Sequence, residues 1–84
     1  MTQEQIIASV RSSIGSELCL SPQEERLISM NTSIDDLGLD SLGLVNVTQE
    51  LEDIYGIKFP KSLGIIKTVD DLVSYVEKNS GTSP

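Results

Sequence analysis

The strongest constraint on the fold lies in residues 41–55. Four apolar residues recur there at intervals of three, four and three: Leu44, Val47, Leu51 and Ile54. This spacing places them on one side of an α-helix, and Gly56 is a natural end for that helix. We predict a helix over about 41–55, and its apolar side requires other helices to cover it.

Two further segments show helical patterns. Apolar residues recur every four positions in residues 3–14, and Gly15 is expected to end that helix. Residues 69–78 carry another apolar face, and Thr68 and Asp71 before it have the spacing of a capping box. Because no segment shows a convincing strand pattern, we predict an all-α fold, a small four-helix bundle with a long first loop and a short third helix.

The connections complete a predicted single domain over residues 1–84. The remaining segments are expected to be a long loop over 15–40, a short third helix over 61–66 and a frayed tail over 79–84. Within the long loop, Ser21 and Pro22 have the signature of a helix start, so one or two helical turns are expected there. Ile34 and Leu37 are expected to anchor the rest of this loop to the core.

Charge limits the partners of the chain. It has 13 acidic and 6 basic residues, no histidine and a formal net charge of −7. Such a surface repels phosphate backbones and anionic lipids, so we expect no nucleic-acid or membrane partner. It favours basic patches on other proteins. Acidic charge also keeps a small protein soluble, so the net charge alone does not decide between these roles.

The cellular setting follows from the cysteine count and the apolar runs. Cys19 is the single cysteine, so no internal disulfide forms and a reducing compartment is expected. No apolar run approaches the length of a transmembrane helix, and the N-terminus lacks a signal-peptide pattern. We expect a free-standing, monomeric, cytoplasmic protein.

Ser41 lies at the start of the helix predicted over 41–55, and several roles are open to it. A serine nucleophile needs a base, usually histidine, and the chain has none. The string GLDSLG is not the G-x-S-x-G elbow, and the acidic residues lack calcium-loop spacing, so we predict neither an enzyme nor a metal site. Either Ser41 or Asp40 could be the N-cap of the helix. A phosphate ester on Ser41 would also be favoured by the helix dipole.

A cap alone does not explain the apolar residues beside Ser41. Leu42 and Val45 lie off the buried stripe, so the first turns are apolar nearly all round. Either these two residues are exposed for docking, or the preceding loop covers them through Leu37 or Leu39. The acidic residues before the helix are interpreted as contacts for a basic partner enzyme: Asp35, Asp36 and Asp40.

Residues 35–60, DDLGLDSLGLVNVTQELEDIYGIKFP, closely resemble the core of acyl carrier proteins. The shared features are LGLDSL, the exit GIKFP and the helix opening TVDDL, in that order within residues 3–78. The resemblance implies a four-helix bundle in which Ser41, flanked by Asp40 and Leu42, bears 4'-phosphopantetheine through a phosphodiester. It also implies a phosphopantetheinyl transferase that uses coenzyme A, and acyl groups held as thioesters. The chain would itself catalyse nothing and would present acyl groups to enzymes such as a ketosynthase or an acyltransferase.

The sequence departs from the typical fatty-acid carrier after the serine. Gly43 and Asn46 stand where that family usually has acids, and Gln49 where a larger apolar residue is common. We therefore predict a specialised carrier for a polyketide-type or dedicated lipid pathway. The predicted docking residues are Asp35, Asp36, Leu42, Val45, Glu52 and Asp53.

Two other readings of the chain remain open. One is a carrier of aminoacyl groups in nonribosomal peptide assembly, although LGLDSL suits acyl carriers better. The other is a non-catalytic acidic interaction domain whose serine is only a helix cap.

Overall fold

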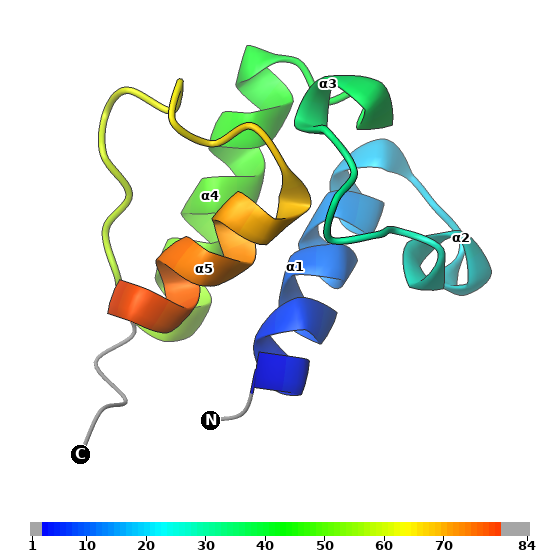
Figure 1. Ribbon diagram of the computed structural model, residues 1–84, viewed down its shortest axis with the longest axis horizontal. Coiled ribbons are helices and arrows are strands. Elements are labelled where there is room, and N and C mark those ends of the chain that lie inside the picture. Colours follow the sequence, from blue (N-terminus) through cyan, green and yellow to red (C-terminus); the bar gives the residue numbers. More distant parts are fainter. Residues whose placement is uncertain (1–2, 80–84) are drawn as a thin grey trace.

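The computed structural model describes residues 3–79 and consists of helices joined by irregular segments (Figure 1). The helices are α1 (Gln3–Leu18), α2 (Pro22–Arg26), α3 (Ile34–Leu37), α4 (Ser41–Tyr55) and α5 (Val69–Asn79). The described residues contain no β-strand, only an isolated antiparallel bridge between Ser33 and Thr68. The all-α prediction is confirmed. The tail predicted over 79–84 begins inside α5, and residues 80–84 lie outside the described part.

The three long helices α1, α4 and α5 enclose the apolar core, and α1 contacts both of the others (Figure 1). The buried apolar residues are Ile6, Val10, Ile14, Ile28, Ile34, Leu39, Leu44, Val47, Leu51, Ile57, Ile66, Val69, Leu72, Val73 and Val76. Polar contacts tie α1 and α4 at both ends. The Tyr55 hydroxyl donates to Ser9 Oγ at 2.7 Å, and Asn46 Nδ2 donates to Glu17 Oε2 at 3.3 Å. These two pairs show that α1 and α4 run antiparallel.

The prediction that Gly15 ends the first helix is wrong, because α1 continues to Leu18. Gly15 is buried inside the helix, and a Cβ atom there would collide with the side chain of Glu25. The helix ends instead at Cys19, whose φ of 58° is left-handed, and the N–H of Leu20 donates to the Gly15 carbonyl at 2.8 Å. The missing side chain of Gly15 therefore makes room for α2 and does not stop the helix.

The long connection predicted over 15–40 is more ordered than expected. Its first turn, α2, has the predicted N-cap: Ser21 Oγ accepts from the Glu24 N–H at 3.2 Å, and Glu24 Oε1 accepts from the Ser21 N–H at 2.9 Å. A second short helix, α3, forms where an irregular loop was predicted. Ser33 caps its start, and Gly38 ends it at a φ of 86°. The Ser-Ile-Asp-Asp-Leu-Gly string thus encodes a single capped turn.

Backbone hydrogen bonds tie the connection before α3 to the start of α5. The Ile34 N–H donates to the Lys67 carbonyl at 2.8 Å, and the Val69 N–H donates to the Thr32 carbonyl at 3.0 Å. These bonds hold Ile34 in the core, as predicted, with only 4% of it exposed. As a result the start of α3 is fixed against the start of α5.

The predicted third helix over 61–66 does not form. Residues 57–68 are irregular, with one turn in which the Ile66 N–H donates to the Leu63 carbonyl at 2.9 Å. The chain between Ile57 and Ile66 runs from the end of α4 to the start of α5. Both of these residues are buried. Pro60 and Gly64 both disfavour a helix over this span. We call residues 61–67 the crossing segment (Figure 1).

The end of α4 also departs from the predicted stripe. Ile54 is 53% exposed, whereas the neighbouring Tyr55 is half-buried. Tyr55 reaches Ser9 on α1, so it occupies the inward position that the stripe assigned to Ile54. The α4 residues that the structure buries are Gly43, Leu44, Val47, Thr48 and Leu51.

Candidate functional site

At the start of α4, the helix cap and the exposed serine are two different residues. Asp40 is the N-cap, and its Oδ1 accepts from the Gly43 N–H at 2.7 Å. Ser41 is the first helical residue and is exposed. Among the described residues, its hydroxyl has no hydrogen-bond partner. This decides between the two caps left open by the sequence, and it leaves the Ser41 hydroxyl available.

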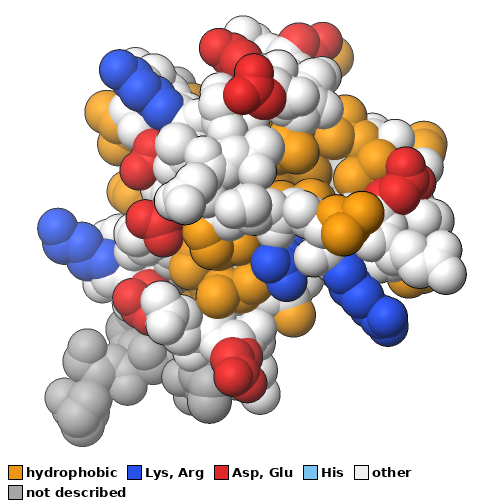
Figure 2. Space-filling view, turned by 45° about the vertical axis from the view of Figure 1, so that its right-hand side comes forward, with side chains coloured by type: hydrophobic (Ala, Val, Ile, Leu, Met, Phe, Trp, Pro, Cys, Tyr) orange, Lys and Arg blue, Asp and Glu red, His pale blue; other side chains and the backbone are white. Residues whose placement is uncertain are grey.

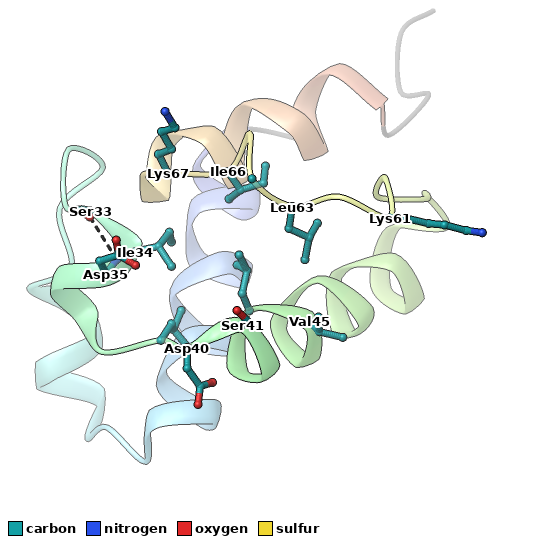
Figure 3. Close-up of a pocket in the computed structure, with 13 residues that line it drawn as sticks. Ser33, Ile34, Asp35, Asp40, Ser41, Val45, Lys61, Leu63, Ile66 and Lys67 are labelled. Atoms are coloured by element: carbon teal, nitrogen blue, oxygen red, sulfur yellow. Dashed lines mark hydrogen bonds between the residues drawn. The ribbon is translucent and has the colours of Figure 1, made fainter.

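A cavity of about 590 Å³ lies next to Ser41, between the first turns of α4 and the crossing segment (Figure 3). This volume lies in the range of roughly 300–1,000 Å³ that small-molecule sites occupy. Its lining residues are Ser33, Ile34, Asp35, Leu39, Asp40, Ser41, Leu44, Val45, Lys61, Leu63, Gly64, Ile66 and Lys67. The apolar members Ile34, Leu39, Leu44 and Ile66 belong to the core, so the cavity connects the exposed serine to the interior.

The two walls of this cavity carry opposite charges. Asp35 and Asp40 come from α3 and the loop before α4, whereas Lys61 and Lys67 lie at the two ends of the crossing segment. In Figure 3 the side chains of both lysines extend away from the cavity, toward solvent. The mouth beside Ser41 is therefore polarised.

The apolar residues beside Ser41 are exposed and not covered by the preceding loop. Leu42 is 69% exposed and Val45 is 37% exposed. Leu39, which could have covered them, is itself buried in the core at 5% exposed. Val45 lines the cavity, and Leu42 lies outside it. Of the two readings that the sequence left open, exposure is therefore correct.

The other predicted docking residues, Asp36, Glu52 and Asp53, do not line the cavity beside Ser41. Asp36 lines a second hollow of about 340 Å³ on the α2 side of the molecule. Its other lining residues are Leu18, Leu20, Glu24, Leu27, Ile28, Thr32 and Leu37. Glu52 is half-buried, and its carboxylate accepts from the Phe59 N–H at 2.7 Å. Asp53 is exposed near the far end of α4. Figure 2 shows acidic side chains spread over one face, with apolar side chains in the hollows between them.

The crossing segment is fixed at its last residue by the cap of α5. Asp71 Oδ2 accepts from the Lys67 N–H at 2.9 Å and from the Thr68 N–H at 3.0 Å, and Thr68 Oγ1 accepts from the Asp71 N–H at 3.2 Å. The predicted capping box is confirmed. The hydrogen bond from the Lys67 N–H, followed by those of Thr68 and the charge of Lys67, lowers the pKa of Asp71 below its ordinary value of 3.8.

Several cavity residues were not assigned to the site from the sequence. Lys61 and Lys67 carry charge at the mouth, and Leu63 and Ile66 form part of the cavity wall. The sequence of 61–66 shows only a weak helical pattern. That pattern does not indicate which part of the protein these side chains line. Their position depends on the hydrogen bonds that hold α3 to the start of α5, and these join residues more than 30 positions apart.

No three histidine, cysteine, aspartate or glutamate side chains of residues 3–79 are grouped so that they could hold a metal ion. No helix in the same range has both the length and the apolar character needed to cross a membrane.

Fold and site together define a class of protein. It is a small helical domain with an exposed serine at the start of a helix, beside a partly apolar cavity. The sequence pattern described as "Phosphopantetheine attachment site" matches residues 8–76. The meromycolate extension acyl carrier protein of Mycobacterium tuberculosis is 35% identical over 85 residues, covering 100% of this chain and 72% of its own. The acyl carrier protein of Thermotoga maritima is 38% identical over 81 residues, covering 95% of this chain and 98% of its own. The chain therefore belongs to the acyl carrier protein family.

Members of this family are carriers without catalytic activity of their own, and their cofactor is 4'-phosphopantetheine. The residues at the start of α4 fit that group. Ser41 offers an exposed hydroxyl that Asp40 leaves free of the capping role, and the adjoining cavity gives a chain attached there an apolar surface. When bound, the group supplies a terminal thiol that holds acyl chains as thioesters. The family interacts with phosphopantetheinyl transferases and acyl-processing enzymes in lipid biosynthesis.

Proposed function

We propose that Ser41 is the residue that bears 4'-phosphopantetheine in this carrier, with Asp40 and Leu42 shaping its surroundings. The observation that supports this most directly is the separation of roles in the first turn of α4. Asp40 caps the helix through Gly43, so the neighbouring serine has no structural hydrogen bond to lose when it is modified. The helix N-terminus also favours the negative charge of a phosphodiester.

In this proposal the chain supplies the acceptor and the transferase supplies the proton chemistry. A bond forms between Ser41 Oγ and the phosphorus that carries pantetheine in coenzyme A. The phosphoanhydride bond breaks, and adenosine 3',5'-bisphosphate leaves. The chain contains no histidine, and Asp40 is engaged as the helix cap, so the proposal assigns removal of the proton from the Ser41 hydroxyl to the transferase. Asp40 keeps the helix start in place while its neighbour reacts.

The cavity beside Ser41 is the proposed shelter for an acyl chain. Its inner wall is apolar, and burying a methylene group contributes about 0.8 kcal/mol. Its outer wall is the crossing segment, which contains Gly64 and has no regular structure. We take this segment as the gate through which the chain enters and leaves.

The departures after Ser41 support a specialised lipid or polyketide-type role. Neither Gly43 nor Asn46 offers a carboxylate to a partner. Gly43 is buried and donates to the Asp40 cap, and Asn46 donates to Glu17. A housekeeping fatty-acid ketosynthase that grips acids at these positions should elongate the acylated carrier slowly. Elongation as fast as that of the ketosynthase's own carrier would contradict the specialised role.

Intact-mass measurement tests the attachment site. The wild-type protein is incubated with coenzyme A and a promiscuous phosphopantetheinyl transferase, alongside Ser41→Ala and the matched control Ser62→Ala. Ser62 is also exposed and lies in the crossing segment. We expect wild type and Ser62→Ala to gain one phosphopantetheinyl mass and Ser41→Ala to gain none. Modification of Ser41→Ala, or no modification of folded wild type, would overturn the proposal.

A further inference from the structure

Lys61 and Lys67 have no part in the proposed attachment of the cofactor. They are two of only six cationic residues in a chain with 13 acidic ones, yet both line the mouth of the cavity beside Ser41. The side chain of Lys61 makes no hydrogen bond or ion pair with any described residue. Lys61 is therefore open to an external partner, and Lys67 is also exposed, although its charge acts on Asp71 as well.

The polarity of the mouth gives a docking partner an orientation. Asp35 and Asp40 line one wall, and Lys61 and Lys67 line the other with their side chains extending toward solvent, so the four charges sum to zero while the whole chain has a net charge of −7. Overall acidity then steers a basic partner toward the molecule, and the two walls determine how it is turned on arrival.

Apolar groups complete this surface. Leu42 and Val45 are exposed beside Ser41, and Ile65, in the crossing segment between the two lysines, is 62% exposed. A docking enzyme can thus bury apolar side chains near the serine while charges at the rim fix its position.

We infer that the phosphopantetheinyl transferase that modifies Ser41 docks across both walls. It presents basic groups to Asp35 and Asp40 and acidic groups to Lys61 and Lys67, with an apolar contact to Leu42 beside Ser41. The inference rests on the proposed function, because it takes Ser41 as the modified residue. In docking through acids alone, the transferase contacts only carboxylates of the carrier and uses only basic groups. In the docking inferred here, it also places acidic groups against the crossing segment.

Charge reversal separates the two kinds of docking. Lys61→Glu is compared with Lys58→Glu, which makes the same change three residues earlier, outside the lining of the cavity. The probe is the phosphopantetheinyl transferase of the source organism, chosen as the enzyme that loads the wild-type carrier from coenzyme A. We expect Lys61→Glu to lower kcat/KM about fivefold, the scale of one exposed ion pair lost, and Lys58→Glu to leave it unchanged.

Docking through acids alone predicts the opposite sign, because each variant makes the carrier more acidic. If Lys61→Glu is loaded as fast as wild type or faster, the inference is wrong. Lys61→Gln should fall between wild type and Lys61→Glu, and the difference from Lys58→Glu should shrink at high ionic strength. Circular dichroism should show all variants folded, since the Lys61 side chain is exposed. Failure of folded wild type to gain a phosphopantetheinyl mass in the intact-mass measurement would contradict the proposed function instead.

Discussion

At the scale of single residues, the start of α4 assigns two tasks to two neighbours. Capping requires an acceptor aimed back at the helix, and Asp40 supplies it to Gly43 at 2.7 Å. Modification requires an exposed hydroxyl, and Ser41 supplies it one position later. A serine that capped the helix would lose that bond on esterification, whereas the arrangement found here keeps the helix start intact before and after the reaction.

Asp40→Ala is therefore expected to destabilise the fold. Loss of the cap leaves the Gly43 N–H without its acceptor and should lower the free energy of unfolding by about 1 kcal/mol. Chemical denaturation of the unmodified protein measures this. The control is Asp36→Ala, which removes an exposed acid that is not a cap and should change stability by less than about 0.5 kcal/mol. Equal stability of the two variants would show that the cap contributes nothing.

At the scale of elements, local sequence patterns predicted the starts of α2 and α5 but missed the capped turn of α3. The N-cap at Ser21 and the Thr68–Asp71 capping box form as expected, and the structure adds the reciprocal bond of Glu24 to Ser21. The start of α4 is likewise local, although the choice between Asp40 and Ser41 needed the structure. Short-range hydrogen bonds compete only with water and with neighbouring groups, so a sequence pattern can identify them.

Ends that depend on distant contacts were predicted wrongly. Glycine is a residue type that often ends helices, but Gly15 is buried inside α1 with the side chain of Glu25 packed against it. The pattern of 61–66 is weakly helical, but Pro60 and Gly64 disfavour a helix, and the chain between the buried residues Ile57 and Ile66 is irregular. The cavity has the same origin, since its walls come from parts of the chain that only the tertiary fold brings together.

The cap of α5 should make stability depend on acid pH. The pKa of Asp71 is lowered in the folded protein, chiefly by the Lys67 N–H, so this carboxylate stabilises the fold above its unfolded pKa. That contribution is lost as pH falls through the lower, folded pKa. Asp71→Asn should therefore be less stable than wild type at pH 7 by about 0.5–1 kcal/mol. The gap should close on acidification below about pH 4.

Thermal unfolding of wild type and Asp71→Asn over this pH range measures the effect. Asp70→Asn is the matched control, since Asp70 is the exposed acid immediately before Asp71 in the first turn of α5. Its stability difference from wild type should be smaller and should reflect only the helix dipole. A gap for Asp71→Asn that stayed constant down to the lowest pH would show that its charge is not what holds the cap.

At the scale of the whole molecule, regular and irregular walls enclose the cavity beside Ser41. α4 supplies one wall through Leu44, which belongs to the core that α1, α4 and α5 share. The crossing segment supplies the opposite wall and is held mainly at its last residues, through Ile66 and the cap at Asp71. Enlarging the cavity by moving the crossing segment would break few hydrogen bonds, whereas moving α4 would disrupt the core.

Hydrogen exchange should therefore distinguish the two walls. We expect amides of residues 61–65 to exchange much faster than those of residues 44–52 in α4, because α4 amides are bonded within a helix packed on the core.

Loading the carrier with a fatty acyl chain should slow exchange at 63–66, where Leu63 and Ile66 line the cavity, more than at residues 3–10 of α1. The loaded form without an acyl chain is the reference that isolates the effect of the chain. Protection of 61–65 equal to that of α4 before acylation would rule out the crossing segment as the gate. An acyl chain that left 63–66 unchanged would place its shelter elsewhere, on a partner enzyme or in solvent.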